Sequence, residues 1–303
     1  MRRTLANLQW ERIRANPTLH PNALLADEAA GDFPWHDHSH SPKSSQVFCI
    51  SAFGTLRQIR QRHRIIHSLL VPIFPAAQTK SPKPRRWDIR LEVEEASLLG
   101  ELGVSQPTSI DAMLISSREV ICIESKFVVD AAAGLGGCGQ VHTKKGDPPR
   151  CAGFHGPGSD LKTRTRAWCR LETWEGRRSP RLYWLLGRQY FRPQVFDRQQ
   201  PGAVCPLRDA NYQLMRNFLF AAASAQRTGR LFFGVIVICP DCTSTVVREQ
   251  VSGFKANILL PEFADRVQFI TYETYIDALR GRGTDAGELA DFLQARIQAV
   301  AAV

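Results

Sequence analysis

Hydrophobic and polar residues alternate over residues 87–95, with Trp87, Ile89, Leu91 and Val93 on one side and charged residues on the other. This period of two predicts a strand with one buried face. Further apolar segments have the length of strands and are bounded by polar or turn-forming residues. These segments are 109–115, 120–127, 231–239 and 267–272.

Apolar residues recur at helical spacing from about residue 46 to residue 70, and Ser44 or Ser45 could cap this helix. Further helical patterns cover 207–228, 277–280 and 288–300. The order is therefore helix, three strands, helix, two strands and helix. It predicts an α/β or α+β fold, in which helices flank one central mixed sheet.

Two parts of the chain lack this regularity. Residues 1–43 are rich in polar residues and prolines and contain the tract His36, His38 and His40, so we expect a loose N-terminal arm. We expect residues 44–303 to form a single domain. Within it, residues 130–205 are rich in Gly, Pro, Arg and Cys, and we interpret them as an insertion.

The chain is basic, because 39 Lys and Arg residues outnumber 29 Asp and Glu residues over 303 positions. A net charge of +10 favours polyanionic partners, nucleic acid first. No apolar run reaches the roughly 18 residues of a membrane span. The N-terminus has no apolar signal region. We therefore expect a soluble cytoplasmic protein with no membrane partner.

Three charged residues interrupt strands that are otherwise apolar, namely Asp111, Glu124 and Lys126. Glu124 and Lys126 are two apart and share a face of their strand. If residues 116–119 form a hairpin turn, Asp111 lies opposite Glu124, about 5 Å away. Adjacent carboxylates repel each other unless a cation lies between them. This cluster suits an oxygen-bound Mg²⁺ ion and phosphodiester hydrolysis, whereas the alternative is a solvated Glu–Lys pair.

The pattern resembles the PD-(D/E)XK nuclease superfamily, to which many restriction endonucleases belong. The superfamily aspartate begins the second core strand, where Asp111 lies, and its (D/E)-x-K occupies the third, where Glu124, Ser125 and Lys126 lie. Ile110 replaces the proline of the superfamily name. Segments 44–46, 109–112, 124–127 and 212–217 resemble one branch of restriction endonucleases more narrowly, and the resemblance covers about residues 44–240.

The resemblance implies a restriction-endonuclease-like core and a site for Mg²⁺ or Mn²⁺. Asp111 and Glu124 would hold the ion, with the carbonyl of Ser125 as a further ligand, and Lys126 would position or activate the attacking water. An upstream acid often assists in this superfamily, and Glu92 and Glu94 are the candidates, with Glu92 slightly favoured. Their alternative role is that of solvated strand charges.

Residues of the helix after the insertion complete the implied site. Related nucleases place a glutamine near the metal, and Gln213 matches it. Gln213 also shares a helix face with Asn217. Arg216 is a candidate phosphate contact. The alternatives are an ordinary amide at a helix–sheet contact for Gln213 and an exposed charge for Arg216.

The insertion carries two further candidate sites. Four cysteines could hold Zn²⁺ or an iron–sulfur cluster, or could be ordinary reduced thiols; they are Cys138, Cys151, Cys169 and Cys205. Basic residues there could follow a DNA backbone, or could serve solubility alone; they include Lys144, Lys145, Arg164 and Arg166. A separate C-x-x-C pair, Cys239 and Cys242, follows a predicted strand and is interpreted as a turn rather than a redox site.

The sequence thus favours a metal-dependent DNA endonuclease that restricts foreign DNA, and double-strand cutting would favour a homodimer. Two alternatives stay open. One is a non-catalytic nucleic-acid-binding protein on the same scaffold, and the other is a structural or regulatory protein organised by a cysteine-bound metal.

Overall fold

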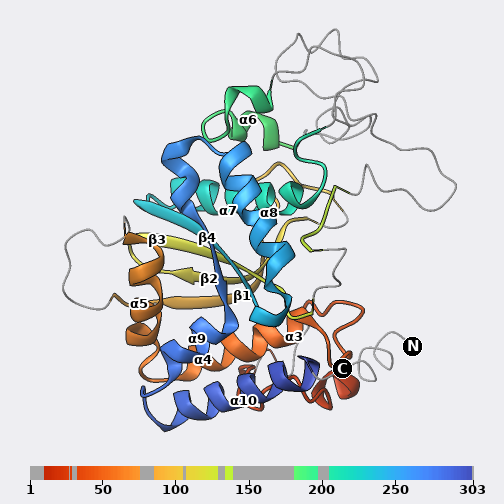
Figure 1. The fold of residues 1–303 in the computed structure, drawn as a ribbon, viewed down its shortest axis with the longest axis vertical. Coiled ribbons are helices and arrows are strands. Elements are labelled where there is room, and N and C mark those ends of the chain that lie inside the picture. The colour runs from red at the N-terminus through yellow and green to blue at the C-terminus, as the bar shows by residue number, and fades with distance from the viewer. Residues whose placement is uncertain are drawn as a thin grey trace, which may run out of the picture.

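A five-stranded mixed sheet forms the centre of the protein in a computed structural model (Figure 1). The structure describes residues 10–26, 28, 33–75, 85–104, 107–128, 134–138, 181–196 and 205–301. The strands are β1 (Asp88–Glu94), β2 (Ser109–Ile115), β3 (Glu119–Ser125), β4 (Phe232–Cys239) and β5 (Val267–Thr271). Their order in the sheet is the order in the sequence. β1, β2 and β3 pair antiparallel, whereas β4 and β5 continue the sheet in parallel.

Helices cover both faces of the sheet (Figure 1). One face packs against α6 (Tyr183–Gly187), α7 (Ala210–Arg227) and α8 (Ser244–Asn257). The other packs against α3 (Ser45–Cys49), α4 (Thr55–Gln58), α5 (Arg62–Ile73), α9 (Tyr272–Leu279) and α10 (Thr284–Ala301). Every residue of β3 is buried, because helices cover both of its faces. The predicted α+β architecture with one central mixed sheet is confirmed.

The first predicted helix is interrupted in the structure. Ser44 is its cap, since its hydroxyl accepts a hydrogen bond from the amide of Val47 at 3.3 Å. A π-helical turn at Ile50–Gly54 then separates α3 from α4, and Ile59 is extended before α5 begins. The apolar spacing alone indicated one continuous helix, because a single widened turn changes the spacing very little.

The C-terminal part contains a helix that the sequence analysis missed. A 3₁₀ turn at Asp241–Thr243 follows β4 directly and leads into α8. The turn expected at the C-x-x-C pair is therefore present, but it leads directly into a helix. Both cysteines are free, Cys239 buried and Cys242 exposed, and burial raises the pKa of the Cys239 thiol to about 12.

The described part of the N-terminal arm is packed rather than loose. Asn16 is buried, and its amide donates hydrogen bonds to the carbonyls of Ser39 at 2.9 Å and Ser41 at 2.8 Å. The Thr18 hydroxyl donates to the carbonyl of Pro42 at 2.7 Å. Polar side chains thus hold residues 33–43 in place, which a polar composition did not reveal.

Much of the expected insertion lies outside the described residues, so its extent stays a prediction. Among the helices that the structure does describe, none has both the length and the apolar character needed to cross a membrane.

Candidate active site

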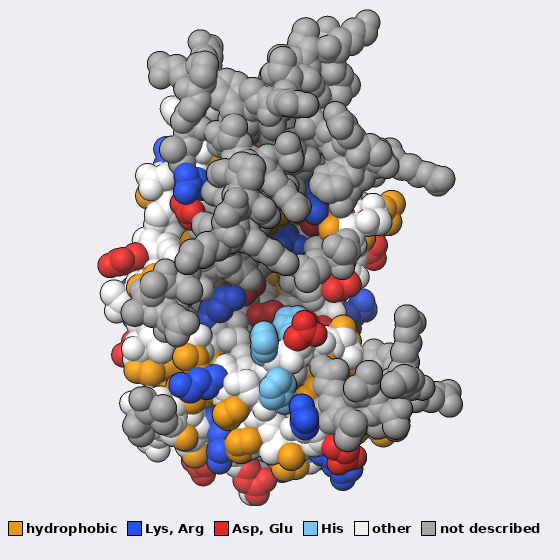
Figure 2. All heavy atoms as spheres, turned by 90° about the vertical axis from the view of Figure 1, so that its right-hand side faces the viewer, with side chains coloured by type: hydrophobic (Ala, Val, Ile, Leu, Met, Phe, Trp, Pro, Cys, Tyr) orange, Lys and Arg blue, Asp and Glu red, His pale blue; other side chains and the backbone are white. Residues whose placement is uncertain are grey.

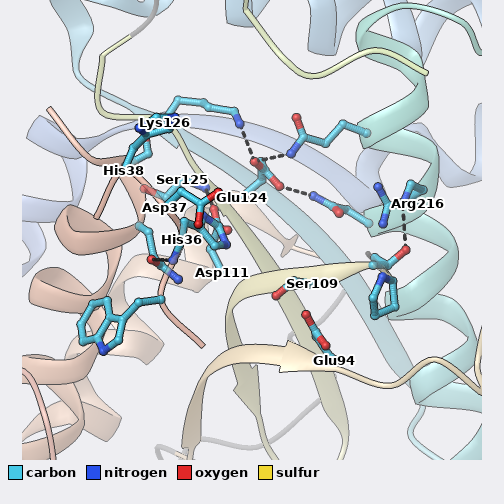
Figure 3. Close-up of a pocket in the computed structure, with 17 residues that line it drawn as sticks. His36, Asp37, His38, Glu94, Ser109, Asp111, Glu124, Ser125, Lys126 and Arg216 are labelled. Carbon is cyan, nitrogen blue, oxygen red and sulfur yellow. Dashed lines mark hydrogen bonds and ion pairs between the residues drawn. The ribbon is translucent and has the colours of Figure 1, made fainter. Parts of the chain in front are cut away.

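The ends of β2 and β3 bring the predicted charged residues together. Ala112 pairs with Ile123, and the same register places Asp111 opposite Glu124, as the hairpin predicted. The amide of Ser125 donates a hydrogen bond to Asp111 Oδ2 at 2.7 Å. Asp111, Glu124, Ser125 and Lys126 therefore lie side by side at one edge of the cavity (Figure 3).

Glu124 is the most enclosed carboxylate of this group, with 2% of its surface exposed. Its Oε1 accepts hydrogen bonds from Lys126 Nζ at 2.9 Å and from the Gln213 amide at 2.7 Å. Its Oε2 accepts one from the Asn217 amide at 2.6 Å. Gln213 in turn accepts a hydrogen bond from the amide of Gly136 at 2.7 Å. Two amides from one face of α7 thus fix the orientation of the Glu124 carboxylate.

Glu92 faces the same group from β1, although the alternation predicted it on the solvated face. Its neighbours Leu91 and Val93 pair with β2, but Glu92 itself adopts φ of 46°, in the left-handed region. The side chain is buried, with 7% of the residue exposed. Ser109 donates to Glu92 Oε2 at 3.3 Å, whereas Oε1 is buried without a hydrogen-bond partner among the described residues.

The carboxylates of this site influence one another. Burial first, and then the negative charges of Glu124 and Glu92, raise the pKa of Asp111 well above its usual range. Burial likewise raises the pKa of Glu92 to about 7, and Glu124 adds to the shift. Burial disfavours the charge of Lys126, but Glu124 and Asp111 outweigh it and raise the lysine pKa. The site thus holds more acidic groups than the single positive charge of Lys126 can balance.

The N-terminal segment forms the opposite wall of the site. The buried side chain of Gln46 accepts a hydrogen bond from the amide of His36 at 2.9 Å and donates one to the carbonyl of Pro34 at 2.9 Å. His36 Nε2 lies 3.6 Å from Glu92 Oε2. Burial and the nearby Lys126 lower the His36 pKa, which favours the neutral ring at neutral pH. Figure 2 shows histidine side chains beside acidic ones at a hollow of this face.

Together these elements enclose a cavity of about 680 Å³. Its N-terminal wall is formed by Trp35, His36, Asp37, His38, Ser45 and Gln46. The strands and the loop before β2 contribute Glu94, Pro107, Thr108, Ser109, Asp111, Glu124, Ser125 and Lys126, and α7 contributes Gln213, Arg216 and Asn217. This is an open, strongly polar site whose floor carries carboxylates and whose walls carry amides and cations.

The other predicted residues are distributed differently. Glu94 is exposed and lies at the side of the cavity away from Lys126 (Figure 3). Cys138 is buried in the core beside α7, and Cys205 packs against the same core. The remaining candidates of the insertion lie outside the described residues, so the cysteine site and the basic surface stay predictions; they are Cys151, Cys169, Lys144, Lys145, Arg164 and Arg166.

Several residues of the cavity were missed or undervalued from the sequence. The tract at 36–40 was expected to lie in a loose arm, yet His36 and His38 line the cavity. The role of Gln46 gave no local signal, because its partners are seven or more positions away in the sequence. Asn217 was recognisable only through its spacing of four from Gln213.

The side chains of the cavity offer the type of ligand that a divalent cation needs, but not a preformed set. Across the described residues, no three His, Cys, Asp or Glu side chains form a ready-made ligand set. The chemistry nevertheless fits a hard cation, since Asp111, Glu124 and Glu92 offer carboxylate oxygens. Among the described residues, the buried Glu92 Oε1 has no hydrogen-bond partner, and the raised pKa values of Asp111 and Glu92 indicate that a positive charge would stabilise their ionised forms.

Residues 2–135 match the family described as "Restriction Endonuclease associating with ARP". This part of the chain is similar to that family of restriction endonucleases. The match includes Asp111, Glu124 and Lys126 and ends before α7, and it indicates a nuclease-like function. The mixed sheet flanked by helices is consistent with a restriction-endonuclease-like fold.

The resemblance to restriction endonucleases inferred from the sequence is therefore confirmed. No curated protein and no solved structure matches the chain.

Proposed function

We propose that the protein is a metal-dependent endonuclease that hydrolyses phosphodiester bonds of DNA. The observation that carries this proposal is the meeting of Asp111, Glu124 and Lys126 at the ends of two paired strands, within a restriction-endonuclease-like region. Buried charges that cluster in a cavity are expensive unless they serve a ligand, so their grouping here favours chemistry over a structural role.

Each side chain of the site has its own role in the proposed reaction. Asp111 and Glu124 would hold Mg²⁺ or Mn²⁺, with the Ser125 carbonyl and Glu92 as further ligands. A bound divalent ion supplies charge stabilisation for the phosphodiester and lowers the pKa of a water molecule. Lys126 Nζ lies 2.9 Å from Glu124 Oε1, where it can hold the attacking water beside the carboxylates. Gln213 and Asn217 keep the Glu124 carboxylate oriented toward the cavity.

The substrate follows from charge and from the family. A net charge of +10 favours a polyanion, and restriction endonucleases act on DNA. We therefore propose DNA as the partner and restriction of foreign DNA in the cytoplasm as the setting. The proposed DNA contacts are Lys144, Lys145, Arg164 and Arg166. A homodimer would allow the enzyme to cut both strands. The four cysteines of the insertion are a proposed Zn²⁺ or iron–sulfur site.

Cleavage of supercoiled plasmid tests the proposal. The wild-type protein should nick the plasmid with Mg²⁺ or Mn²⁺ but not with EDTA. Asp111→Ala and Lys126→Ala should abolish nicking, while both variants still retard a DNA fragment on a gel. Glu94→Gln is a matched control that removes a carboxylate from the exposed side of the cavity.

Two results would count against the enzyme. If the wild type and the variants retard DNA equally and none nicks it with either metal, the protein is a non-catalytic binder on the same scaffold. If nicking survives in both Asp111→Ala and Lys126→Ala, another site does the chemistry.

A further inference from the structure

A buried carboxylate that the nuclease chemistry does not use lies behind the cavity. Glu101 follows β1, and only 1% of its surface is exposed. Its Oε2 accepts a hydrogen bond from the Thr108 amide at 2.7 Å, and its Oε1 accepts one from the Thr108 hydroxyl at 3.0 Å. The Tyr183 hydroxyl of α6 also donates to Oε1. Three donors from two chain segments therefore satisfy this buried charge.

Arg216 of α7 lies between this carboxylate and the cavity. Its Nε donates to the Thr108 hydroxyl at 2.8 Å, and its nearer terminal nitrogen lies 3.8 Å from Glu101 Oε1. The guanidinium carbon lies 5.4 Å from the ring centroid of Tyr212, close enough for a cation–π contact. Contacts on several sides thus hold the planar group in one orientation.

The geometry differs from that of a salt bridge that serves only stability. At 3.8 Å, Arg216 and Glu101 are too far apart for a direct hydrogen bond, and Thr108 and Tyr183 already satisfy the carboxylate. Arg216 lines the cavity with Glu124 and keeps 22% of its side chain exposed. A guanidinium has five N–H donors, so a group held through Nε retains donors for a ligand.

We propose that Arg216 is the phosphate-binding group of the cavity and that Glu101 is a positioning residue that acts on it through Thr108. The ligand class is a phosphodiester or another phosphate oxyanion, for which a guanidinium fork is geometrically suited. The identification of this ligand as DNA rests on the proposed nuclease function. The Tyr183 hydroxyl donates to the same Glu101 oxygen as the Thr108 hydroxyl, so the four residues form one connected hydrogen-bond network from the buried layer to the cavity.

Binding measured in EDTA separates this proposal from catalysis. The full chain is titrated into a fluorescein-labelled oligonucleotide at several salt concentrations, and the affinity is plotted against salt. Arg216→Ala should weaken binding roughly ten-fold and lower the slope of the salt dependence by about one. Arg227→Ala is the matched control, because Arg227 lies on the same helix with 49% of its side chain exposed, and it should behave as the wild type.

Glu101→Gln distinguishes positioning from charge. The Arg216 charge remains, so the salt slope should stay unchanged while the affinity falls several-fold. Thr108→Val removes the hydroxyl between Glu101 and Arg216 and should show the same pattern. Thr108→Val takes the place of Glu101→Gln if Glu101→Gln is unfolded at the temperature of the titration. Thermal melting of each variant, followed by circular dichroism, establishes that the protein being titrated is folded.

Different results would contradict the role of Arg216 and the role of Glu101. If Arg216→Ala binds with wild-type affinity and slope, Arg216 is not the phosphate contact. If Glu101→Gln and Thr108→Val lower only the melting temperature and leave binding unchanged, Glu101 has a structural role alone. The nuclease proposal fails separately, when metal-dependent nicking is absent although the Arg216 effect on binding is present.

Discussion

Replacing Glu92 by glutamine should change how the stability of the metal-free protein depends on pH. Glu92 is buried, and its pKa rises from an ordinary value of 4.5 to about 7 on folding, because burial and the charge of Glu124 disfavour ionisation. A raised pKa means that the folded state binds the proton more tightly than the unfolded state. The stabilisation is therefore fully present below pH 4.5 and is lost as the pH rises through about 7.

The magnitude follows from the two pKa values. Each tenfold change in proton affinity is worth about 1.4 kcal/mol, so the full difference is about 3 kcal/mol. Between about pH 5 and about pH 8, ionisation of this one group removes about 2–3 kcal/mol of the unfolding free energy. Only 7% of Glu92 is exposed, so solvent screens this effect weakly. Glutamine has a similar shape and no ionisable proton, and Glu92→Gln should lack this component.

Urea unfolding in EDTA measures the effect. The unfolding free energy of Glu92→Gln relative to the wild type should improve by about 2–3 kcal/mol between about pH 5 and about pH 8. Glu94→Gln, an exposed change on the same strand, is the matched control and should parallel the wild type. Added Mn²⁺ should raise the unfolding free energy of the wild type more at pH 8 than at pH 5, because more carboxylates are then ionised and attract the ion. If the unfolding free energies of Glu92→Gln and the wild type change equally from pH 5 to pH 8, folding does not raise the pKa of Glu92 as proposed here.

Other changes have equally definite outcomes. Gln213→Ala removes one of the donors that hold Glu124. It should lower the cleavage rate by roughly tenfold with little effect on gel retardation. Ser44→Ala removes a helix cap and should cost about 1 kcal/mol in urea unfolding. Tyr272→Phe leaves the buried Ser125 hydroxyl, 2.7 Å from the Tyr272 oxygen, without that partner and should cost about 1–3 kcal/mol. A cost below 0.3 kcal/mol in either unfolding experiment would contradict the assigned contact.

The strands and the central charged group could be predicted because their signals are local. The turn at 116–119 fixes the register of β2 against β3, and this register alone places Asp111 opposite Glu124. The spacing of four between Gln213 and Asn217 likewise fixes a shared helix face. Both signals depend on backbone geometry within one element or one hairpin.

The parts that were missed depend on contacts between distant segments. The burial of Glu92 accompanies a left-handed backbone conformation at this residue. A glutamate gives no indication of such a conformation in the sequence, whereas a glycine would. The packing of the arm depends on Asn16 and Gln46, whose partners lie elsewhere in the chain. The helix α8 was missed because Pro240 and Asp241, which precede it, indicate a turn, although α8 buries Val247, Val251 and Phe254 against the core.

The central claim is that Asp111 and Glu124 share a divalent cation. Crystals soaked in Mn²⁺, with anomalous diffraction recorded at the manganese edge, test it most directly. The account predicts a peak in contact with carboxylate oxygens of both residues, and loss of that peak in Asp111→Ala. A peak bound only elsewhere, or no peak while Lys126 and Glu124 remain paired, would contradict it.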